Sequence, residues 1–100
     1  MASNAAINLS ATGVVVAGVA GKRHRVLALH VQRDETVATT VTVQSWNGTT
    51  ATAVSGDTTK SFVLPFNPEG WFVTEVGEGV RLALSAAIDV DGHIVTATVG

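Results

Sequence analysis

The sequence predicts an all-β fold, a single-domain antiparallel β-sandwich or jelly roll of about eight strands. Apolar and β-branched runs recur at intervals of roughly 8 to 12 residues, with Gly, Asn, Asp or Pro between them. No segment fits the helical period better than it fits the two-residue period of a strand. Residues 62–72 show the same organisation locally, because they read as a strand, a rigid turn and a second strand.

The N-terminal third predicts an arm, two short strands and one long strand. Residues 1–6 are small and polar without a pattern, so a flexible arm is expected there, followed by a sandwich domain over residues 7–100. Short strands are expected over residues 7–9 and 14–16. Residues 25–32 alternate, yet both alternating sets are largely apolar, which is typical of a central strand covered on both faces.

The middle of the chain predicts a half-exposed strand followed by a hairpin. Residues 37–44 place valines and a threonine on one side and small or polar residues on the other. Asn47 and Gly48 follow, and because both accept positive φ they form the strongest short hairpin signal in the chain. The return strand is expected over residues 49–54, and another strand over residues 60–64.

A proline-bounded corner is expected next. Pro65 and Pro68 are the only prolines, and each fixes its own φ and favours extended geometry in the preceding residue. The corner should therefore be stiff. Trp71 follows directly, and a large aromatic held at the start of a strand suits a sandwich core. The expected core and corner residues are Trp46, Pro65, Phe66, Pro68, Trp71 and Phe72.

The C-terminal third is expected to hold strands over residues 71–76, 80–86 and 93–99. Residues 82–90 include good helix formers, but apolar residues alternate there, so a long strand is favoured over a helix. Asp91 and Gly92 form a second hairpin signal between the last two strands.

Composition indicates one domain that buries apolar surface against other subunits. The 100 residues are 46% hydrophobic and only 14% charged, an apolar balance for a small domain with much surface to keep hydrated. A contiguous apolar face on such a protein usually marks an interface, so homo-oligomerisation is expected. The absence of cysteine excludes disulfides, thiolate metal sites and cysteine nucleophiles.

Charge and hydropathy argue against two classes of partner. The formal net charge of −2 disfavours nucleic acid, which requires a basic face, and the basic cluster at residues 22–25 is too short to change that. No apolar run approaches the roughly 18 to 20 residues of a membrane span, and residues 1–4 lack the features of a signal peptide. We therefore expect no nucleic acid and no membrane as partner, and synthesis in a cytoplasm.

The sequence shows no constellation of catalytic or metal-binding residues. His24, His30 and His93 lack the spacing that places two imidazoles on one element, and His30 is expected to be hydrogen-bonded at a core edge or a subunit interface. The serines match no nucleophile motif, and the Gly77-Glu78-Gly79 run is too short to form a phosphate loop. We expect no catalytic residue, no metal, no cofactor and no enzymatic activity.

The two tryptophans leave one alternative open. Trp46 and Trp71 are each expected near a strand end, where an indole can stack on a sugar ring in a carbohydrate-binding module. In a jelly roll such a tryptophan more often lies in the core or at an interface. That position is favoured here, and sugar binding is kept as the alternative.

Three segments and the final strand carry a family resemblance. They are the Gly- and Val-rich start over residues 13–27, the corner over residues 64–72 with its Asn-Pro-Glu-Gly-Trp-Phe run, and the Gly-Glu-Gly-Val-Arg-Leu run that opens residues 77–87. Residues 94–99 complete the set. With these features the chain resembles small virion proteins of tailed bacteriophages, of the jelly-roll head decoration, or cement, type.

The resemblance implies a homotrimer on the outside of a phage head, where it binds the major capsid protein and stabilises contacts between capsid subunits. The implied location is the exterior of the virion, after synthesis in the host bacterial cytoplasm. A head fibre, a tail component, or a receptor- or carbohydrate-binding module is the alternative. In the decoration role, the arm would add a strand to an exposed capsid edge through Ala2, Ser3, Asn4, Ala5 and Ala6.

Overall fold

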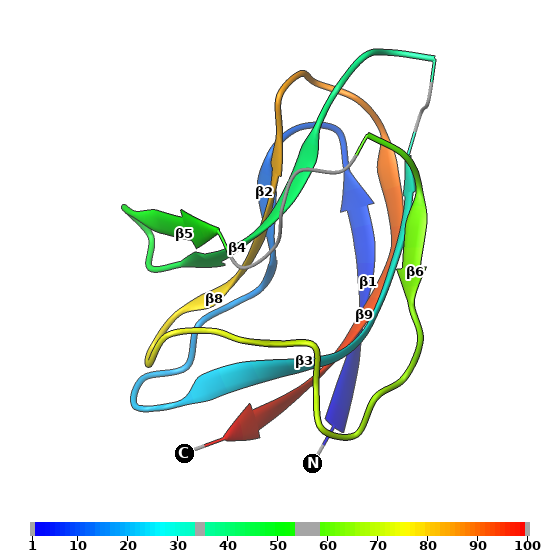
Figure 1. Cartoon of the computed structure of the whole chain (residues 1–100). Helices are drawn as coiled ribbons and strands as arrows, with labels where there is room; N and C mark the ends of the chain where they lie inside the picture. The colour runs from blue at the N-terminus through cyan, green and yellow to red at the C-terminus, as the bar shows by residue number, and fades with distance from the viewer. Residues whose placement is uncertain (1, 34–35, 54–58, 100) are drawn as a thin grey trace.

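Two antiparallel sheets face each other in the computed structural model, which describes residues 2–33, 36–53 and 59–99 (Figure 1). No helix occurs among these residues. Sheet A contains, in spatial order, β1 (Ala2–Leu9), β9 (Val90–Val99), β3 (Arg23–Arg33) and β6 (Phe62–Leu64), with the short β7 (Phe72–Val73) also paired to β3. Sheet B contains β2 (Gly13–Val16), β8 (Gly79–Leu84), β4 (Val41–Trp46) and β5 (Ala51–Ala53).

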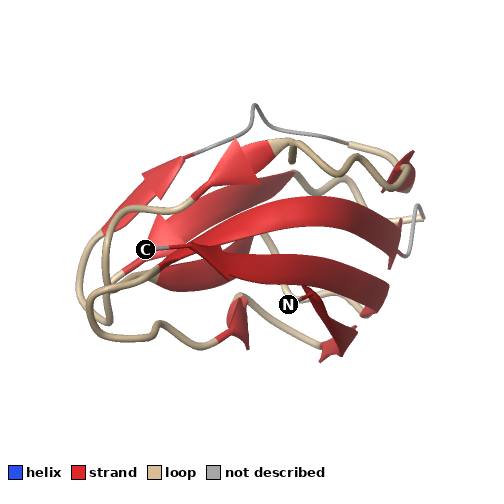
Figure 2. Cartoon of the chain, turned by 90° about the horizontal axis from the view of Figure 1, so that it is seen from below, coloured by secondary structure: helices blue, strands red, loops and turns tan. Residues whose placement is uncertain are grey.

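The strand pairing is that of a jelly roll. β1 pairs with β9, β2 with β8, β3 with β6 and β4 with β5, all antiparallel. Such nested pairs arise when a chain doubles back on itself as one long hairpin and the hairpin then winds across two sheets. Seen from below, the two sheets form separate curved layers (Figure 2). The predicted all-β, jelly-roll-like sandwich is therefore confirmed, with β7 as an additional short strand.

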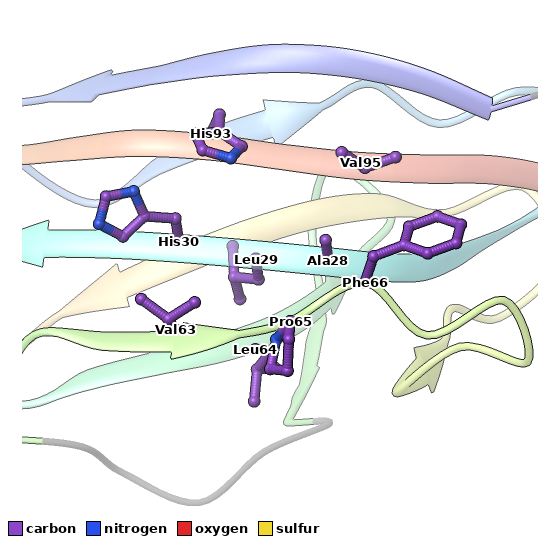
Figure 3. A pocket seen from close by; sticks show the side chains of 9 residues that line it. All are labelled: Ala28, Leu29, His30, Val63, Leu64, Pro65, Phe66, His93 and Val95. Atoms are coloured by element: carbon purple, nitrogen blue, oxygen red, sulfur yellow. The ribbon is translucent and has the colours of Figure 1, made fainter.

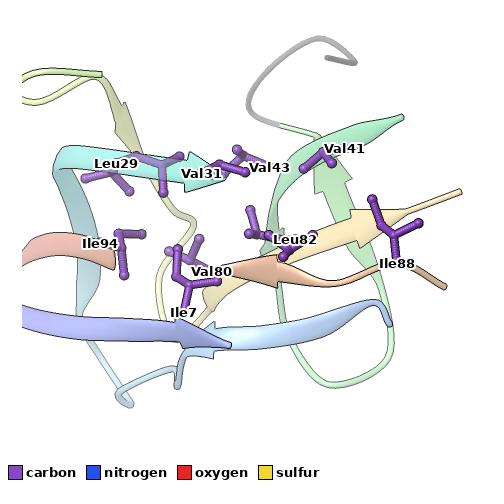
Figure 4. Packing of buried hydrophobic residues seen from close by; sticks show 11 residues of the cluster. Ile7, Leu29, Val31, Val41, Val43, Val80, Leu82, Ile88 and Ile94 are labelled. Atoms are coloured by element: carbon purple, nitrogen blue, oxygen red, sulfur yellow. The ribbon is translucent and has the colours of Figure 1, made fainter. Parts of the chain in front are cut away.

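The core between the sheets is aliphatic (Figure 4). Leu29 of β3, Leu82 of β8 and Ile94 of β9 have no exposed surface, and they bring together both sheets. Complete burial of such a side chain contributes roughly 1.5–3 kcal/mol to stability. The remaining buried members of the cluster are Ile7, Val26, Val31, Val41, Val43, Val80, Ile88 and Val90.

A bulge in β3 explains the unusual apolar pattern of that strand. The register with β9 shifts between Val26 and Ala28, which leaves Leu27 as an extra residue. Val26 and Leu29 therefore both face the core although three positions separate them. Within the described residues no layer covers the opposite face of β3. The expectation of a strand buried on both faces is wrong, because Ala28 and His30 on the outer face are only half-buried and Gln32 is exposed, while the bulge adds Leu27 to the apolar run.

The N-terminal boundary differs from the prediction. Residues 2–6 do not form an arm but belong to β1, which pairs residue for residue with β9 from Ala2 opposite Ala97 to Leu9 opposite Val90. The backbone ladder needs no apolar pattern, and Ile7, which is buried, anchors the strand. The small polar residues thus mark an edge strand. Met1 lies outside the described residues.

Two predictions about the C-terminal third are also wrong. β8 ends at Leu84, and Ile88 is buried where the chain crosses to the other sheet, so residues 82–90 are not one strand. Gly92 lies inside β9 rather than in a hairpin, with φ 148°. A Cβ there would collide with the backbone carbonyl of His30, so this glycine permits close approach of two strands instead of a turn.

The hairpin signal at Asn47 and Gly48 is confirmed. The backbone N–H of Asn47 donates to Thr50 O at 3.2 Å, and Gly48 takes φ 95°. Asn47 does not adopt positive φ. Its side-chain Oδ1 instead accepts hydrogen bonds from Thr49 N and Thr50 N. The return strand, β5, covers Ala51–Ala53, and the predicted continuation to Val54 lies outside the described residues.

Candidate interaction site

The proline corner is fixed against β3 by backbone hydrogen bonds. Asn67 N donates to Leu27 O and Trp71 N donates to Val26 O, each at 2.8 Å. Asn67 O also accepts from Gly70 N at 2.9 Å, which closes the turn. The corner is therefore attached at the β3 bulge, where displaced carbonyls are free to accept. The predicted position of the corner is correct.

The aromatic residues of the corner do not fill the core. Phe66 is 62% exposed and Trp71 is 43% exposed, whereas Phe72 packs against the core cluster. Strand alternation explains the difference, because Phe72 lies opposite the inward Val26 and its neighbours therefore point away. The indole Nε1 of Trp71 donates to Pro65 O at 2.8 Å, which holds the ring beside the corner.

Trp46 is also outside the core cluster. Its half-buried ring lies under the guanidinium of Arg81, with Cζ at 4.0 Å from the ring centroid. Pro65 and Pro68 are exposed. Of the six residues expected in the core or corner, only Phe72 packs against the core, while the two prolines and Phe66 form the corner itself.

Four large apolar side chains form an exposed strip along β6, the corner and β7. We call this set, Val63, Phe66, Trp71 and Val73, the apolar strip. Val63 lies opposite His30, and Val73 opposite Arg25, on the outer face of sheet A. Paired residues of an antiparallel ladder point to the same face, so the strip and the outward side chains of β3 share one surface.

A shallow groove of about 380 Å³ runs beside the strip on this outer face (Figure 3). β3, β6, β9 and the corner contribute its walls. The lining is predominantly apolar and consists of Ala28, Leu29, His30, Val63, Leu64, Pro65, Phe66, His93 and Val95. Its shape suits contact with another macromolecular surface better than enclosure of a small molecule.

Two histidines meet on the groove. His30 of β3 lies directly opposite His93 of β9, and their ring centroids are 5.4 Å apart with an interplanar angle of 74°. Within the described part of the chain neither ring forms a hydrogen bond, so the hydrogen-bonded position expected for His30 is not observed. Spacing along the sequence could not reveal this pair, because the two residues come together only through strand register.

The third histidine, His24, is buried and structural. His24 Nε2 donates to Ala17 O at 2.8 Å, and its backbone N–H donates to Thr74 Oγ1 at 2.9 Å. Nearby, a side-chain hydrogen bond joins β4 to the loop before β8: Ser45 Oγ donates to Glu78 Oε1 at 2.6 Å. Only the backbone N–H of His24 is connected to these residues, through the hydroxyl of Thr74, which donates to Glu78 O. The hydroxyl of Ser45 thus donates to a carboxylate, not to an imidazole, and it accepts a hydrogen bond from Glu75 N.

The residues expected to contact a capsid lie along the edge of sheet A. β1 is the terminal strand of the sheet, and no described strand pairs with its outer side. Ser3, Asn4 and Ala6 are exposed and Ala5 is half-buried. The backbone of Ala2 belongs to the same ladder. The edge therefore presents backbone hydrogen-bonding groups on the side away from β9.

The structure contains no group of three or more His, Cys, Asp or Glu side chains able to hold a metal ion, within the residues it describes. None of the described segments forms a helix that could cross a membrane. Comparison with protein-family models, curated proteins and solved structures found no match. The chain is thus defined by its jelly-roll fold, and its function must be inferred from its own surfaces.

Proposed function

We propose that this chain is a capsid decoration protein of a tailed bacteriophage, which binds the outer surface of the head as a homotrimer and reinforces contacts between capsid subunits. The observation that carries the proposal is the apolar strip. Val63 and Phe66 are each 62% exposed on one face of a small domain. Large apolar side chains gathered on one surface favour contact with another protein.

Burial of the apolar strip against the capsid would supply stabilising free energy for attachment to the head. Burying an exposed Val or Phe side chain contributes roughly 1.5–3 kcal/mol, and a standard specific interface needs about 800 Å² from each partner. A trimer presents three equivalent contact surfaces to a head. Because the second and third contacts form within one attached particle, moderate individual contacts combine into tight binding.

The edge of β1 supports a second contact with the capsid. Residues 2–9 contain neither proline nor a charged side chain, and their register with β9 has no bulge. Proline, charge and bulges are the usual features that prevent an edge strand from pairing with another chain. We therefore keep residues 2–6 as capsid-contacting residues, with β1 accepting a strand from the capsid while remaining in its own sheet.

Binding to undecorated heads tests the proposal. Phe66→Ser should reduce occupancy of the heads, since it removes apolar surface from the strip. Val76→Ser is a matched control, because Val76 is 53% exposed but lies outside the strip. Occupancy is measured by electron microscopy of heads mixed with each variant. Equal occupancy for Phe66→Ser and wild type would contradict a role of the strip, and no binding by wild type would contradict the decoration function.

The oligomeric state has its own measurement. Light scattering at micromolar concentration should give three times the mass of one chain. A mass equal to that of one chain would contradict a homotrimer in solution.

Exposure of Trp71 favours a second candidate, a receptor- or carbohydrate-binding module. The indole is 43% exposed and its Nε1 is fixed by Pro65 O, so one edge of a rigid ring is held in place. A rigid aromatic surface can stack on a sugar. Binding to a glycan array that Trp71→Ala abolishes, together with no binding to heads, would favour this candidate over decoration.

A further inference from the structure

We propose that His30 and His93 form a binding site for a divalent transition-metal ion of the zinc, nickel or copper type. The two residues occupy opposite positions of the β3–β9 ladder and project onto the outer face of sheet A (Figure 3). The inference concerns a site that the decoration function does not require, and it stands or falls independently of that function.

Both imidazoles are available to a ligand. His93 is exposed and His30 is half-buried. Among the described residues neither ring forms a hydrogen bond or an ion pair, and the two rings contact each other edge to face. His24 differs, because its Nε2 donates to Ala17 O within the structure. Ring nitrogens without a protein partner can donate their lone pairs to a metal.

The separation of the rings fits shared coordination. A metal ion about 2.0 to 2.1 Å from one nitrogen of each imidazole, with near-tetrahedral angles, holds the two ring centroids roughly 5 Å apart. The observed centroid separation is 5.4 Å. The β3–β9 ladder therefore already holds the two rings at about the separation that shared coordination requires.

The backbone between the two residues is rigid, which favours a preformed site. Both residues lie inside long strands, and the ladder is continuous from Ala28 opposite Val95 to Arg33 opposite Val90. Gly92, next to His93, lies against the backbone of His30 and keeps the strands close. A ligand pair on paired strands loses less conformational freedom on binding than a pair on loops.

The chemistry of two imidazole ligands selects the class of metal. Imidazole suits zinc, copper and nickel, whereas calcium and magnesium require oxygen ligands. The described residues offer no third His, Cys, Asp or Glu positioned to complete the site. The remaining coordination positions would be taken by water, or by a side chain of whatever protein covers the groove. The site is thus an open one, next to the apolar strip.

Calorimetric titration with zinc chloride tests the inference on the intact chain. We expect saturable binding of one zinc ion per chain by wild type. His30→Gln and His93→Gln should each abolish saturable binding over the concentration range that saturates wild type. Asp91→Asn is the control, because Asp91 is exposed on the same face of β9, two positions from His93, and should leave binding unchanged.

A spectroscopic measurement on the wild-type chain identifies the metal ligands directly. The electron paramagnetic resonance spectrum of wild type with one equivalent of copper(II) should show coupling to two imidazole nitrogens, and each histidine variant should show fewer. Thermal melts without metal would verify that the variants fold. The proposal is overturned if wild type shows no saturable zinc binding, if either histidine variant binds like wild type, or if the copper spectrum lacks coupling to two nitrogens.

Discussion

The interior of the sandwich and the outer face of sheet A use apolar residues of different kinds. Among the described residues, the buried apolar side chains of the core cluster are aliphatic, such as Leu29, Leu82 and Ile94. The outer face instead exposes Phe66 and Trp71 beside two valines. Two sheets packed about 10 Å apart accommodate β-branched and leucine side chains well. Size and hydrophobicity alone therefore do not assign a residue to the core of this molecule.

The contribution of the aliphatic core to stability is tested most strongly by Leu29→Ala. Leu29 has no exposed surface, so its truncation should lower the free energy of unfolding by about 2–5 kcal/mol through lost burial and a residual cavity. Urea denaturation followed by tryptophan fluorescence measures the change. A loss below about 1 kcal/mol would show that the core relaxes to close the cavity.

Gly92→Ala tests the close contact between β9 and β3 that supports the outer groove. A Cβ at this position meets the backbone carbonyl of His30, and φ of 148° is unfavourable for alanine. We expect destabilisation of about 1–3 kcal/mol. Gly48→Ala is a useful comparison, because Gly48 also has positive φ but a Cβ added there would have no neighbour within 4 Å. Gly92→Ala should be the more harmful of the two in thermal melts.

Trp71→Ala examines the outer face directly. The substitution removes the hydrogen bond to Pro65 O and part of a half-exposed ring, so we expect a loss of about 1 kcal/mol. Emptying a buried tryptophan site would cost about 3–5 kcal/mol. Chemical denaturation therefore distinguishes a half-exposed indole from a buried one. A loss of about 3–5 kcal/mol would show that Trp71 is buried in the core.

Phe66→Ser should have the smallest effect on the isolated fold. Its side chain is 62% exposed, so the free energy of unfolding should change by no more than about 0.5 kcal/mol. The measurement is a denaturation curve under conditions in which the chain is monomeric. A substantially larger loss would mean that Phe66 stabilises the domain itself rather than its contacts.

Patterns along the chain predict the sandwich because turns and alternation are local properties. The hairpin at Asn47 and the corner at Pro65 are predictable from neighbouring residues. The strand predicted over residues 37–44 is only partly correct, because β4 covers Val41–Trp46 and Val37 is exposed. The β3 bulge is not predictable, because one extra residue in a strand leaves no signal distinct from a continuous apolar run. The prediction at Gly92 fails for a related reason, since a glycine in a turn and a glycine that permits close strand approach look alike in sequence.

The candidate site is even less predictable from the sequence than the fold. The size of Trp71 predicts a core position, yet the one-residue alternation of β7 directs Phe72 inward and Trp71 outward. His30 and His93 are brought together only by the register of β3 with β9. The composition does indicate an exposed apolar surface, but its location requires the topology of the sheets.

Pairing of β1 with β9 joins residues 2–9 to residues 90–99, which are far apart in the described sequence. During synthesis, residues 2–9 leave the ribosome long before their partner exists, and sheet A cannot be completed until residues 90–99 have emerged. Folds dominated by such non-local contacts form slowly, since a long loop must close before the contacts repay its entropy. A chain truncated near its C-terminus would leave both β1 and β3 without their central neighbour, and such unpaired strands favour aggregation.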